Sequence, residues 1–468
     1  MVVELSKKDE KFRDLSLNGN IWKLIWKVSL PLAFYYTFQW LLGLFEMMMA
    51  SHISALAVSA TTYLSQLVNI LNAIGSGLAA GCCVKISESY GAGKYDLVKK
   101  QLSTLIAMAL ILSGLIIALI PFTSTILKLL GTPESFIEIG SKYFIIKLIY
   151  CVLFILTTVY VGIERLRGKS KKLLILNLVT ALVDFCLTWF FVYKLNCDVT
   201  MLAVAPVIST SILLIFGIFN LCFKNDAFSF SFKYVSFKRD ITFPLLKISY
   251  PTMIERTFFQ IGRTFMNVLA SFYGELAVGA LGLSNTINGI PYQTQTGFQD
   301  GGSAVISQNR GAKKIKRTEK IFNRIMIINL IIGFIAWILL NLFFNQISAL
   351  FSTTAHGNDL EFQKMLINIF RWDSLGSCVP MGVSITCFAY LMGFGKTKQV
   401  LIINIFRIFV YRIPILFLLQ KFTSLGPEAT GIVMGISNSL TAIHIYIVVK
   451  LEMKKQCKML ENQENECE

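Results

Sequence analysis

Long apolar runs recur along this chain, and they constrain its fold more than any other feature. The clearest are residues 105–122 and 325–344, each with 18 or more largely apolar residues in succession. About 20 apolar residues cross the hydrocarbon core of a bilayer as a helix, and a helix satisfies its own backbone hydrogen bonds there. The sequence therefore predicts an all-α polytopic membrane protein.

Twelve such segments can be placed, and charged residues make up only 15% of the chain, against about 25% in soluble proteins. The second and eighth segments are rich in Gly, Ser, Thr, Asn and Gln, so we expect them to face protein or a water-filled cavity. The predicted segments lie near residues 24–48, 55–83, 102–122, 139–163, 173–194, 200–222, 243–272, 276–308, 321–346, 363–393, 399–420 and 427–451.

The connections between these segments alternate between basic stretches and short or acidic ones. The N-terminus, residues 91–100, 164–172 and 309–320 and the C-terminus belong to the basic set. Because cytoplasmic loops carry the Lys and Arg excess, both termini are expected in the cytoplasm, with the chain in the plasma (inner) membrane. The net charge of +17 is then a topology signal and not the mark of a nucleic-acid partner.

Several classes of function are disfavoured by what the sequence lacks. The ten Cys are scattered singly except for Cys82 and Cys83, and neither CxxC nor a His-spaced cluster occurs, so no metal centre or disulfide framework is indicated. Residues 1–20 are polar, so no cleavable signal peptide is expected. No phosphate loop or nucleophile constellation is present either, and we expect neither an enzyme nor a cofactor.

The two halves of the chain repeat each other. A shift of 220 along the chain aligns residues 29–94 with 249–314 without a gap and gives nineteen identities in 66 positions. A second match, at a shift of 227, pairs residues 169–177 with 396–404. The register includes Pro, Ser and Gly-Ala landmarks, which apolar bias alone does not explain.

Each repeat holds six segments, an even number, so both copies enter the membrane from the same side. We therefore expect twelve transmembrane helices in two six-helix lobes related by a pseudo-twofold axis along the membrane normal, in a monomer. The predicted parts are a cytoplasmic segment 1–20, an N-terminal lobe 21–223, a cytoplasmic linker 224–240, a C-terminal lobe 241–452 and a cytoplasmic tail 453–468.

Ionisable residues within the spans are the candidate functional groups, because each costs about 2.5–3.5 kcal/mol to insert. Glu46 and Asp184 lie in apolar surroundings with no basic residue within a turn. They could share a proton, or they could hold Na⁺ together with hydroxyl and carbonyl oxygens. A structural ion pair is the alternative for each.

A second ion or substrate site could involve Glu255, Asp300 and Asp373, although for Asp300 and Asp373 a structural role is favoured. Aromatic and polar residues could line a cavity for flat cations through stacking and cation–π contact. These cavity candidates are Tyr35, Tyr36, Trp40, Tyr292 and Gln293.

Ordered landmarks in each half resemble those of the multidrug and toxic compound extrusion (MATE) family. They are a Pro-led first helix (Pro31, Pro251), a Leu-Ala helix start (Leu56-Ala57, Leu276-Ala277), a Gly-Ala inward turn (Gly91-Ala92, Gly311-Ala312) and a later Gly/Lys-rich turn with a downstream Asn (Gly168, Asn177; Gly393, Gly395, Asn404). The resemblance covers about residues 20–450. It implies a two-lobed antiporter that expels organic cations in exchange for H⁺ or Na⁺.

The resemblance also implies ion-coupling positions. Glu46 occupies the place of the family's Asp in the first helix, and Asp184 matches the Asp of its Asn-x-x-x-Asp pattern. Thr180 replaces the Asn of that pattern, and Asn177 lies one turn earlier. The family Glu of the seventh helix would fall at Phe259, whereas Glu255 lies nearer the proline. These departures change the ligand set, so the coupling ion stays open.

We therefore expect a secondary antiporter that exports cationic or amphipathic small molecules by alternating access. A flippase for a lipid-linked saccharide, from a related branch of the superfamily, is the main alternative. Twelve spans and interior carboxylates favour the exporter, since such flippases often have extra helices and more cationic cavities. A non-transporting receptor or scaffold is the least favoured reading.

Overall fold

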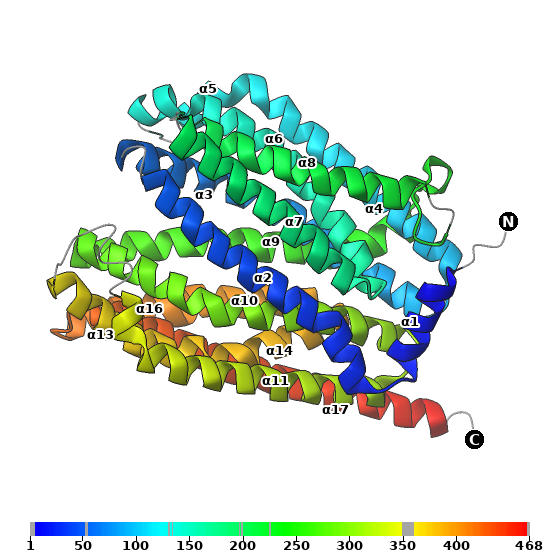
Figure 1. The fold of residues 1–468 in the computed structure, drawn as a ribbon. Helices are drawn as coiled ribbons and strands as arrows, with labels where there is room; N and C mark the ends of the chain where they lie inside the picture. Colours follow the sequence, from blue (N-terminus) through cyan, green and yellow to red (C-terminus); the bar gives the residue numbers. More distant parts are fainter. Residues whose placement is uncertain are drawn as a thin grey trace. The chain divides into compact units, whose positions relative to one another are not determined.

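The computed structural model describes residues 5–51, 55–129, 132, 134–195, 197, 200–223, 226–348 and 360–465. Within these ranges the chain forms helices and no β-strand (Figure 1). Each of the twelve predicted segments falls on one helix or on helices that follow one another directly. The predicted all-α polytopic fold is therefore confirmed.

The first half of the chain contains a short N-terminal helix and then six spans. The helices are α1 (Lys7–Leu17), α2 (Ile21–Ser51), α3 (Ala55–Gly91), α4 (Tyr95–Leu119), α5 (Thr123–Leu129), α6 (Glu134–Leu166), α7 (Ser170–Trp189) and α8 (Met201–Cys222). A π-helical turn, η2 (Phe190–Lys194), extends α7.

The second half repeats this order. Its helices are α9 (Arg239–Ala270), α10 (Glu275–Gly311), α11 (Ile315–Leu342), α13 (Leu360–Ser377), α14 (Val379–Gly393), α15 (Thr397–Ile405), α16 (Ile413–Phe422) and α17 (Glu428–Asn465). A π-helical stretch, η5 (Phe406–Arg412), joins α15 to α16. The fifth span of each half thus contains a π segment.

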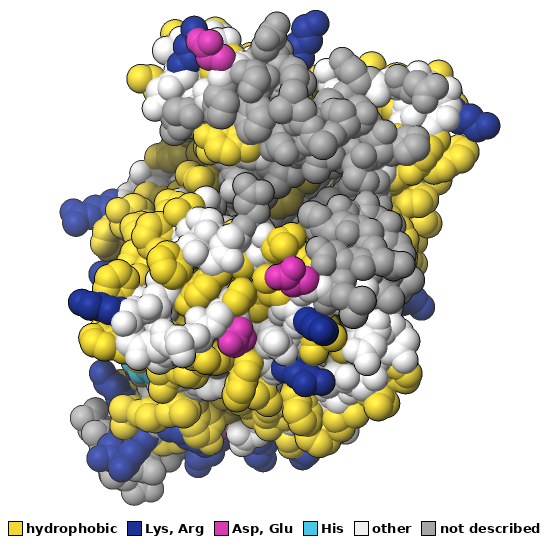
Figure 2. Space-filling view, turned by 90° about the vertical axis from the view of Figure 1, so that its left-hand side faces the viewer, with side chains coloured by type: hydrophobic (Ala, Val, Ile, Leu, Met, Phe, Trp, Pro, Cys, Tyr) yellow, Lys and Arg dark blue, Asp and Glu magenta, His cyan; other side chains and the backbone are white. Residues whose placement is uncertain are grey.

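Nine helices among the described residues are long and apolar enough to cross a membrane. The other three predicted segments correspond to α2, α9 and α10. Many large apolar side chains point outward, as on α4 (Leu115, 62% exposed) and α11 (Ile331, 53% exposed). Figure 2 shows hydrophobic side chains over much of the described surface at one end of the molecule, with charged groups scattered among them. The exposed apolar side chains along α4 and α11 form the kind of surface that contacts lipid.

The chain divides into two compact units, and the division does not fall between the halves. Unit 1 contains residues Met1–Leu15 and Phe38–Gln260, and unit 2 contains Ser16–Thr37 and Ile261–Glu468. One cut lies near the end of α1, and the other two lie inside α2 and inside α9, the first span of each half. The first part of each of these helices is therefore packed with helices of the other half of the sequence.

Two glycines of α3 explain why the first part of α9 packs with helices of the first half in unit 1. A Cβ atom on Gly77 would lie 2.6 Å from the Cα atom of Met253, and one on Gly81 would meet the backbone of Ser249. Cys82 and Ser249 also form a sulfur–oxygen hydrogen bond of 3.0 Å. Small residues four apart allow two helix backbones to approach closely, so α9 lies directly on α3.

The corresponding glycines of α10 produce the same contact in unit 2. A Cβ atom on Gly297 would meet the backbone of Ala33, and one on Gly301 would meet Ser29. All four positions are the equivalents of the unit 1 positions in the gapless register of the internal repeat. The repeat therefore duplicates a helix crossing and not only a set of helices.

Basic turns of unit 1 gather around a buried arginine. Arg167 donates hydrogen bonds to Asp9 (2.6 Å), Asp226 (2.7 Å) and Glu164 (3.2 Å). Burial alone would raise the pKa of Asp9, but the hydrogen bonds and charge of Arg167, with the Ser6 hydrogen bond and the Lys169 charge, together leave that pKa below its ordinary value. This cluster fixes α1 against the turns that follow α6 and α8.

Basic turns of unit 2 gather in the same way, and their partners are backbone carbonyls and one buried acid, Glu452, whose Oε1 lies 3.1 Å from Lys396 Nζ. Arg310 donates to the carbonyl of Phe394 at 2.6 Å. Lys314 donates to the carbonyl of Leu17 at 3.1 Å. The α10–α11 turn, the α14–α15 turn and the segment before α2 therefore meet at one end of the unit.

Candidate functional site

Unit 2 contains a fully buried carboxylate. Asp373, on α13, accepts hydrogen bonds from Ser284 Oγ (2.7 Å) and Asn288 Nδ2 (2.9 Å) of α10. Ser377 Oγ, one turn further along α13, donates to its other oxygen at 2.6 Å. Three donors directed at one carboxylate match an ionised group, which can only accept.

A buried arginine completes this network from η5. Arg412 donates to Ser437 Oγ at 3.2 Å and to Asn438 Oδ1 at 3.0 Å. Asn438 Nδ2 in turn donates to Ser377 Oγ at 3.0 Å. A continuous chain of hydrogen bonds thus joins Arg412 to Asp373 through two neutral side chains. π segments interrupt helices frequently at functional positions, and here the segment carries two buried cations, Arg407 and Arg412.

The members of this network were only partly visible in the sequence. Asp373 was predicted from its charge, and Arg412 stands out as a basic residue inside an apolar segment. Ser284, Asn288 and Asn438 were missed, because single Ser and Asn residues in membrane helices usually serve packing and give no separate signal.

The predicted ion-coupling residues of the fifth span share one face of α7. Asn177, Thr180 and Asp184 are spaced by three and four residues, which places them in line. Asn177 Nδ2 donates to the carbonyl of Leu173 and Thr180 Oγ1 to that of Leu176, each at 2.8 Å. One N–H of Asn177 and the hydroxyl of Thr180 are thus used within α7. The three side chains also carry oxygen atoms that can accept hydrogen bonds or bind a cation.

The backbone of Glu46 belongs to α2, but its side chain lies outside the described residues. Asp184 is half-buried. Whether the two carboxylates share a site therefore stays a prediction.

The three acids grouped in a second site lie in different places. Glu255 is half-buried on α9 within unit 1, whereas Asp300 and Asp373 belong to unit 2. Asp300 accepts a hydrogen bond from Tyr36 at 2.7 Å. Asn288, which binds Asp373, is twelve residues from Asp300 on α10, about 18 Å along the helix. The structure does not bring Asp300 and Asp373 together.

One of the predicted cavity residues, Tyr36, contacts Asp300. The rings of Tyr35 and Tyr36 are 5.2 Å apart, and Thr37 is hydrogen-bonded to Thr294 at 2.7 Å. Tyr292 and Gln293 are half-buried on α10, and Trp40 is half-buried on the part of α2 that belongs to unit 1.

Metal ligation of the usual kind has no support in the described part of the chain, where no three His, Cys, Asp or Glu side chains form a group. A cation at the α7 face would instead be held by mixed amide, hydroxyl and carboxylate oxygens. Hard ions such as Na⁺ prefer oxygen ligands, as Ca²⁺ and Mg²⁺ do.

Comparison with known proteins agrees with this architecture. The relatives include the "Probable multidrug resistance protein YoeA" of Bacillus subtilis (strain 168), 24% identical over 389 residues, which span 81% of this chain and 82% of the relative. The "Multidrug export protein MepA" of Staphylococcus saprophyticus is 22% identical over 397 residues, 84% and 85% of the two chains.

Solved structures share the fold along nearly the whole chain. The outward-facing conformation of a multidrug resistance MATE family transporter of the MOP superfamily superposes with a TM-score of 0.90 at 20% identity, covering 97% of this chain and 100% of that one. A MOP superfamily transporter from Pyrococcus furiosus, whose binding pocket is described as having reverse polarity, gives 0.89 at 19% identity, with 97% and 99% coverage.

The family model MatE matches this chain twice, over residues 31–190 and 251–418. The two matches begin at Pro31 and Pro251, the landmarks that open the internal repeat. Together they cover well over half of the sequence. The chain therefore belongs to the multidrug and toxic compound extrusion (MatE) family of membrane transporters.

Proposed function

We propose that this transporter exports amphipathic, cationic small molecules in exchange for H⁺ or Na⁺. The observation that carries the proposal is the acceptor face of α7, where Asp184 follows Thr180 and Asn177. Ionisable groups are retained inside membrane spans mainly where they face an interior and take part in transport. The names of the relatives, multidrug resistance and export proteins, point to the same class of substrate.

Within this proposal the coupling ion is bound by Asp184 together with Glu46. Loading the ion shifts the balance between outward- and inward-open states by its differential affinity for the two. Thr180 and Asn177 would supply hydroxyl and amide oxygens if the ion is Na⁺, and they would hydrogen-bond the carboxyl group if it is H⁺.

Asp373 has a different role in this account. Its three donors and its link to Arg412 balance its charge, so a proton or a cation would have to compete with contacts already made. We propose that this network keeps the helices of unit 2 in register. Asp300, with Tyr35 and Tyr36, is the better candidate in unit 2 for contact with a cationic substrate, through charge and cation–π interaction.

The orientation follows from the charge of the connections. The basic turns of each unit gather at one end, and the Lys and Arg excess marks the cytoplasmic side. We therefore propose cytoplasmic termini and a plasma-membrane location, with one chain as the functional unit because it carries both lobes.

Purified protein in proteoliposomes tests the function. An imposed pH gradient or an imposed Na⁺ gradient should drive export of a cationic dye, and the ion that works identifies the coupling ion. The Glu46→Gln variant should insert and fold but lose gradient-driven export. Full export by that variant would remove Glu46 from the mechanism. Scrambling of labelled lipid without dye transport under either gradient would favour the flippase.

A further inference from the structure

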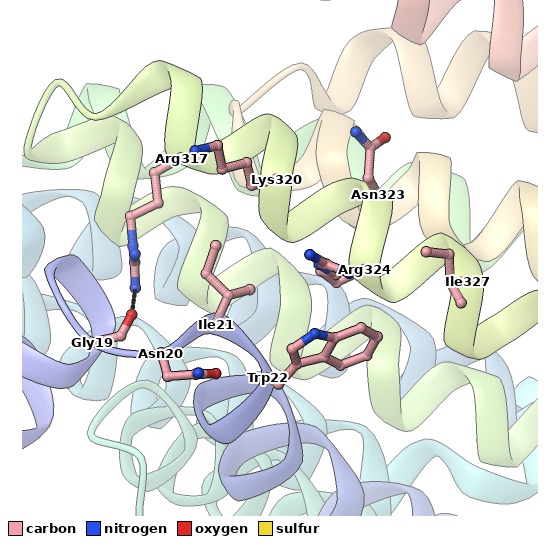
Figure 3. A pocket seen from close by; sticks show the side chains of 9 residues that line it. All are labelled: Gly19, Asn20, Ile21, Trp22, Arg317, Lys320, Asn323, Arg324 and Ile327. Carbon is pink, nitrogen blue, oxygen red and sulfur yellow. Dashed lines mark hydrogen bonds between the residues drawn. The ribbon is translucent and has the colours of Figure 1, made fainter.

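A cavity that the transport proposal does not use opens at the basic end of unit 2. Its volume is about 580 Å³, and it lies between the start of α2 and the first turns of α11 (Figure 3). The lining residues are Gly19, Asn20, Ile21, Trp22, Arg317, Lys320, Asn323, Arg324 and Ile327.

The lining is cationic on one side and carries no acid. Arg317, Lys320 and Arg324 follow at intervals of three and four residues, so all three lie on one face of α11. None of the nine lining residues is Asp or Glu. Glu319, the acid next to Lys320, is instead in contact with Cys457 of α17, whose sulfur lies 3.2 Å from Oε1. The cavity therefore presents positive charge that no lining group neutralises.

Two of the cations are held in place before any ligand binds. Arg317 donates to the carbonyls of Gly19 (2.6 Å) and Ser16 (3.1 Å). The guanidinium of Arg324 lies 4.7 Å from the centre of the Trp22 ring. Preorganised donors lose little freedom when they bind an anion. Lys320 and Asn323 are exposed beside them.

The position of the cavity along α11 indicates the level of the lipid headgroups. Arg324 is the last charged residue of this helix, and the run from Ile325 to Leu342 carries no charge. A run of that length is close to the roughly 20 residues that cross the hydrocarbon core. Trp22 is the kind of side chain that anchors helices at the membrane–water boundary.

An exposed apolar stripe continues from the cavity along the same face of α11. Ile327, Ile331, Phe334 and Ile335 are between 43% and 55% exposed, and their spacing of three and four residues extends the line of Lys320 and Arg324. A molecule with a phosphate head and hydrocarbon tails would match both parts. Free phosphate would use only the first.

We propose that this cavity binds the headgroup of an anionic phospholipid, with the phosphate among Arg317, Lys320 and Arg324 and an acyl chain along the apolar stripe of α11. Basic pockets between spans are a recurrent way of holding such headgroups. The bound lipid would join the beginning of α2 to α11, and so strengthen the packing of residues 16–37 within unit 2.

Native mass spectrometry of the full-length protein, with short-chain phosphatidylglycerol as the probe, tests the site. Phosphatidylcholine with the same chains, glycerol phosphate and inorganic phosphate serve as competitors. Phosphatidylglycerol should be retained over phosphatidylcholine, and the two chain-free anions should not displace it at equal concentration. The Lys320→Gln variant, which removes one exposed charge, should weaken retention about fivefold, and the Lys320→Gln/Arg324→Gln double variant should weaken it further.

Lys313→Gln/Lys316→Gln is the matched control, because both lysines are exposed at the same end of α11 and neither lines the cavity. It should leave retention unchanged. An equal loss in this control would mean diffuse attraction to anionic lipid and overturn the proposal. Equal retention of phosphatidylcholine, or displacement by inorganic phosphate alone, would also overturn it. A thermal unfolding scan of each variant without added lipid separates loss of the site from loss of the fold.

Discussion

The fifth spans of the two halves each contain a π segment, but these segments lie at different register positions and the spans differ in charge. In the register of the second internal match, Asn177 of α7 corresponds to Asn404 of α15, and Asp184 corresponds to Tyr411. Thr180 corresponds to Arg407, and the buried Arg412 follows at the end of η5. The span that carries an acid in one half therefore carries bases in the other.

The fourth spans also differ in charge, in the opposite sense. Asp373 of α13 is one residue from the register position of Lys147 on α6. Lys147 lies over the rings of Tyr143 and Tyr150, 5.5 and 5.2 Å from their centres. The fourth span of the first half thus carries a base and that of the second half an acid, at neighbouring but not equivalent positions. The glycine crossings, in contrast, are identical in both units. Duplication preserved the contacts that build the scaffold, while the charged interiors diverged.

The largest expected effect concerns the shared crossings. Gly77→Leu and Gly297→Leu should each destabilise the protein by about 3 kcal/mol or prevent folding, because the new side chain meets backbone and not another flexible side chain. Size-exclusion chromatography and thermal unfolding measure this. Gly282→Leu, on the same helix as Gly297 but with nothing within 4 Å of an added Cβ atom, is the control. A severe loss of stability in only one of the two variants would show that the two helix crossings do not contribute equally to the fold.

The charged interiors should respond unequally. Asp373→Asn leaves Arg412 buried without its counter-charge and should cost about 3 kcal/mol of stability, whereas Asp184→Asn should cost less than about 1 kcal/mol because Asp184 is half-buried. The double variant Asp373→Asn/Arg412→Gln should cost less than the sum of its single variants, since the two groups share one network. Additive costs would show that the hydrogen-bond chain does not couple them.

The buried cluster at the end of unit 1 should make the stability of the protein sensitive to acid. Asp9 has a pKa below its ordinary value of 3.8, so its ionised form stabilises the fold above that pH and the contribution disappears as the pH falls through the lowered pKa. Asp9→Asn should cost about 2 kcal/mol at pH 7 and flatten the acid limb of a stability–pH curve. Glu10→Gln removes an exposed acid on the same helix. It should change neither the stability at pH 7 nor the acid limb of the stability–pH curve.

The smallest effect concerns one turn. Gly93 and Lys313 are register equivalents, and both adopt a left-handed backbone, with φ of 76° and 59°. A side chain in this conformation costs about 1 kcal/mol. Lys313→Gly should therefore raise the unfolding temperature slightly, and no change would mean that contacts of the lysine offset the strain.

Much of this architecture could be predicted, for identifiable reasons. Apolar runs fixed the twelve spans, and the landmarks around Pro31 and Pro251 gave the register. The exchange of the first parts of α2 and α9 could not be predicted, because an internal alignment matches Gly77 to Gly297 without saying which copy of the first helix each contacts. The Asp373 network was only half visible, since Ser284 and Asn438 look like packing residues until the fold brings them together.

We propose that ion coupling resides in the N-terminal half, at Asp184, and that the Asp373 network stabilises the packing of the helices in unit 2. The direct measurement is gradient-driven dye export from proteoliposomes, per folded molecule, for Asp184→Asn and Asp373→Asn side by side. The account predicts that Asp184→Asn folds normally but loses coupled export, and that Asp373→Asn is less stable but still couples in the fraction that folds. Full coupled export by Asp184→Asn, with coupling lost in folded Asp373→Asn, would contradict it.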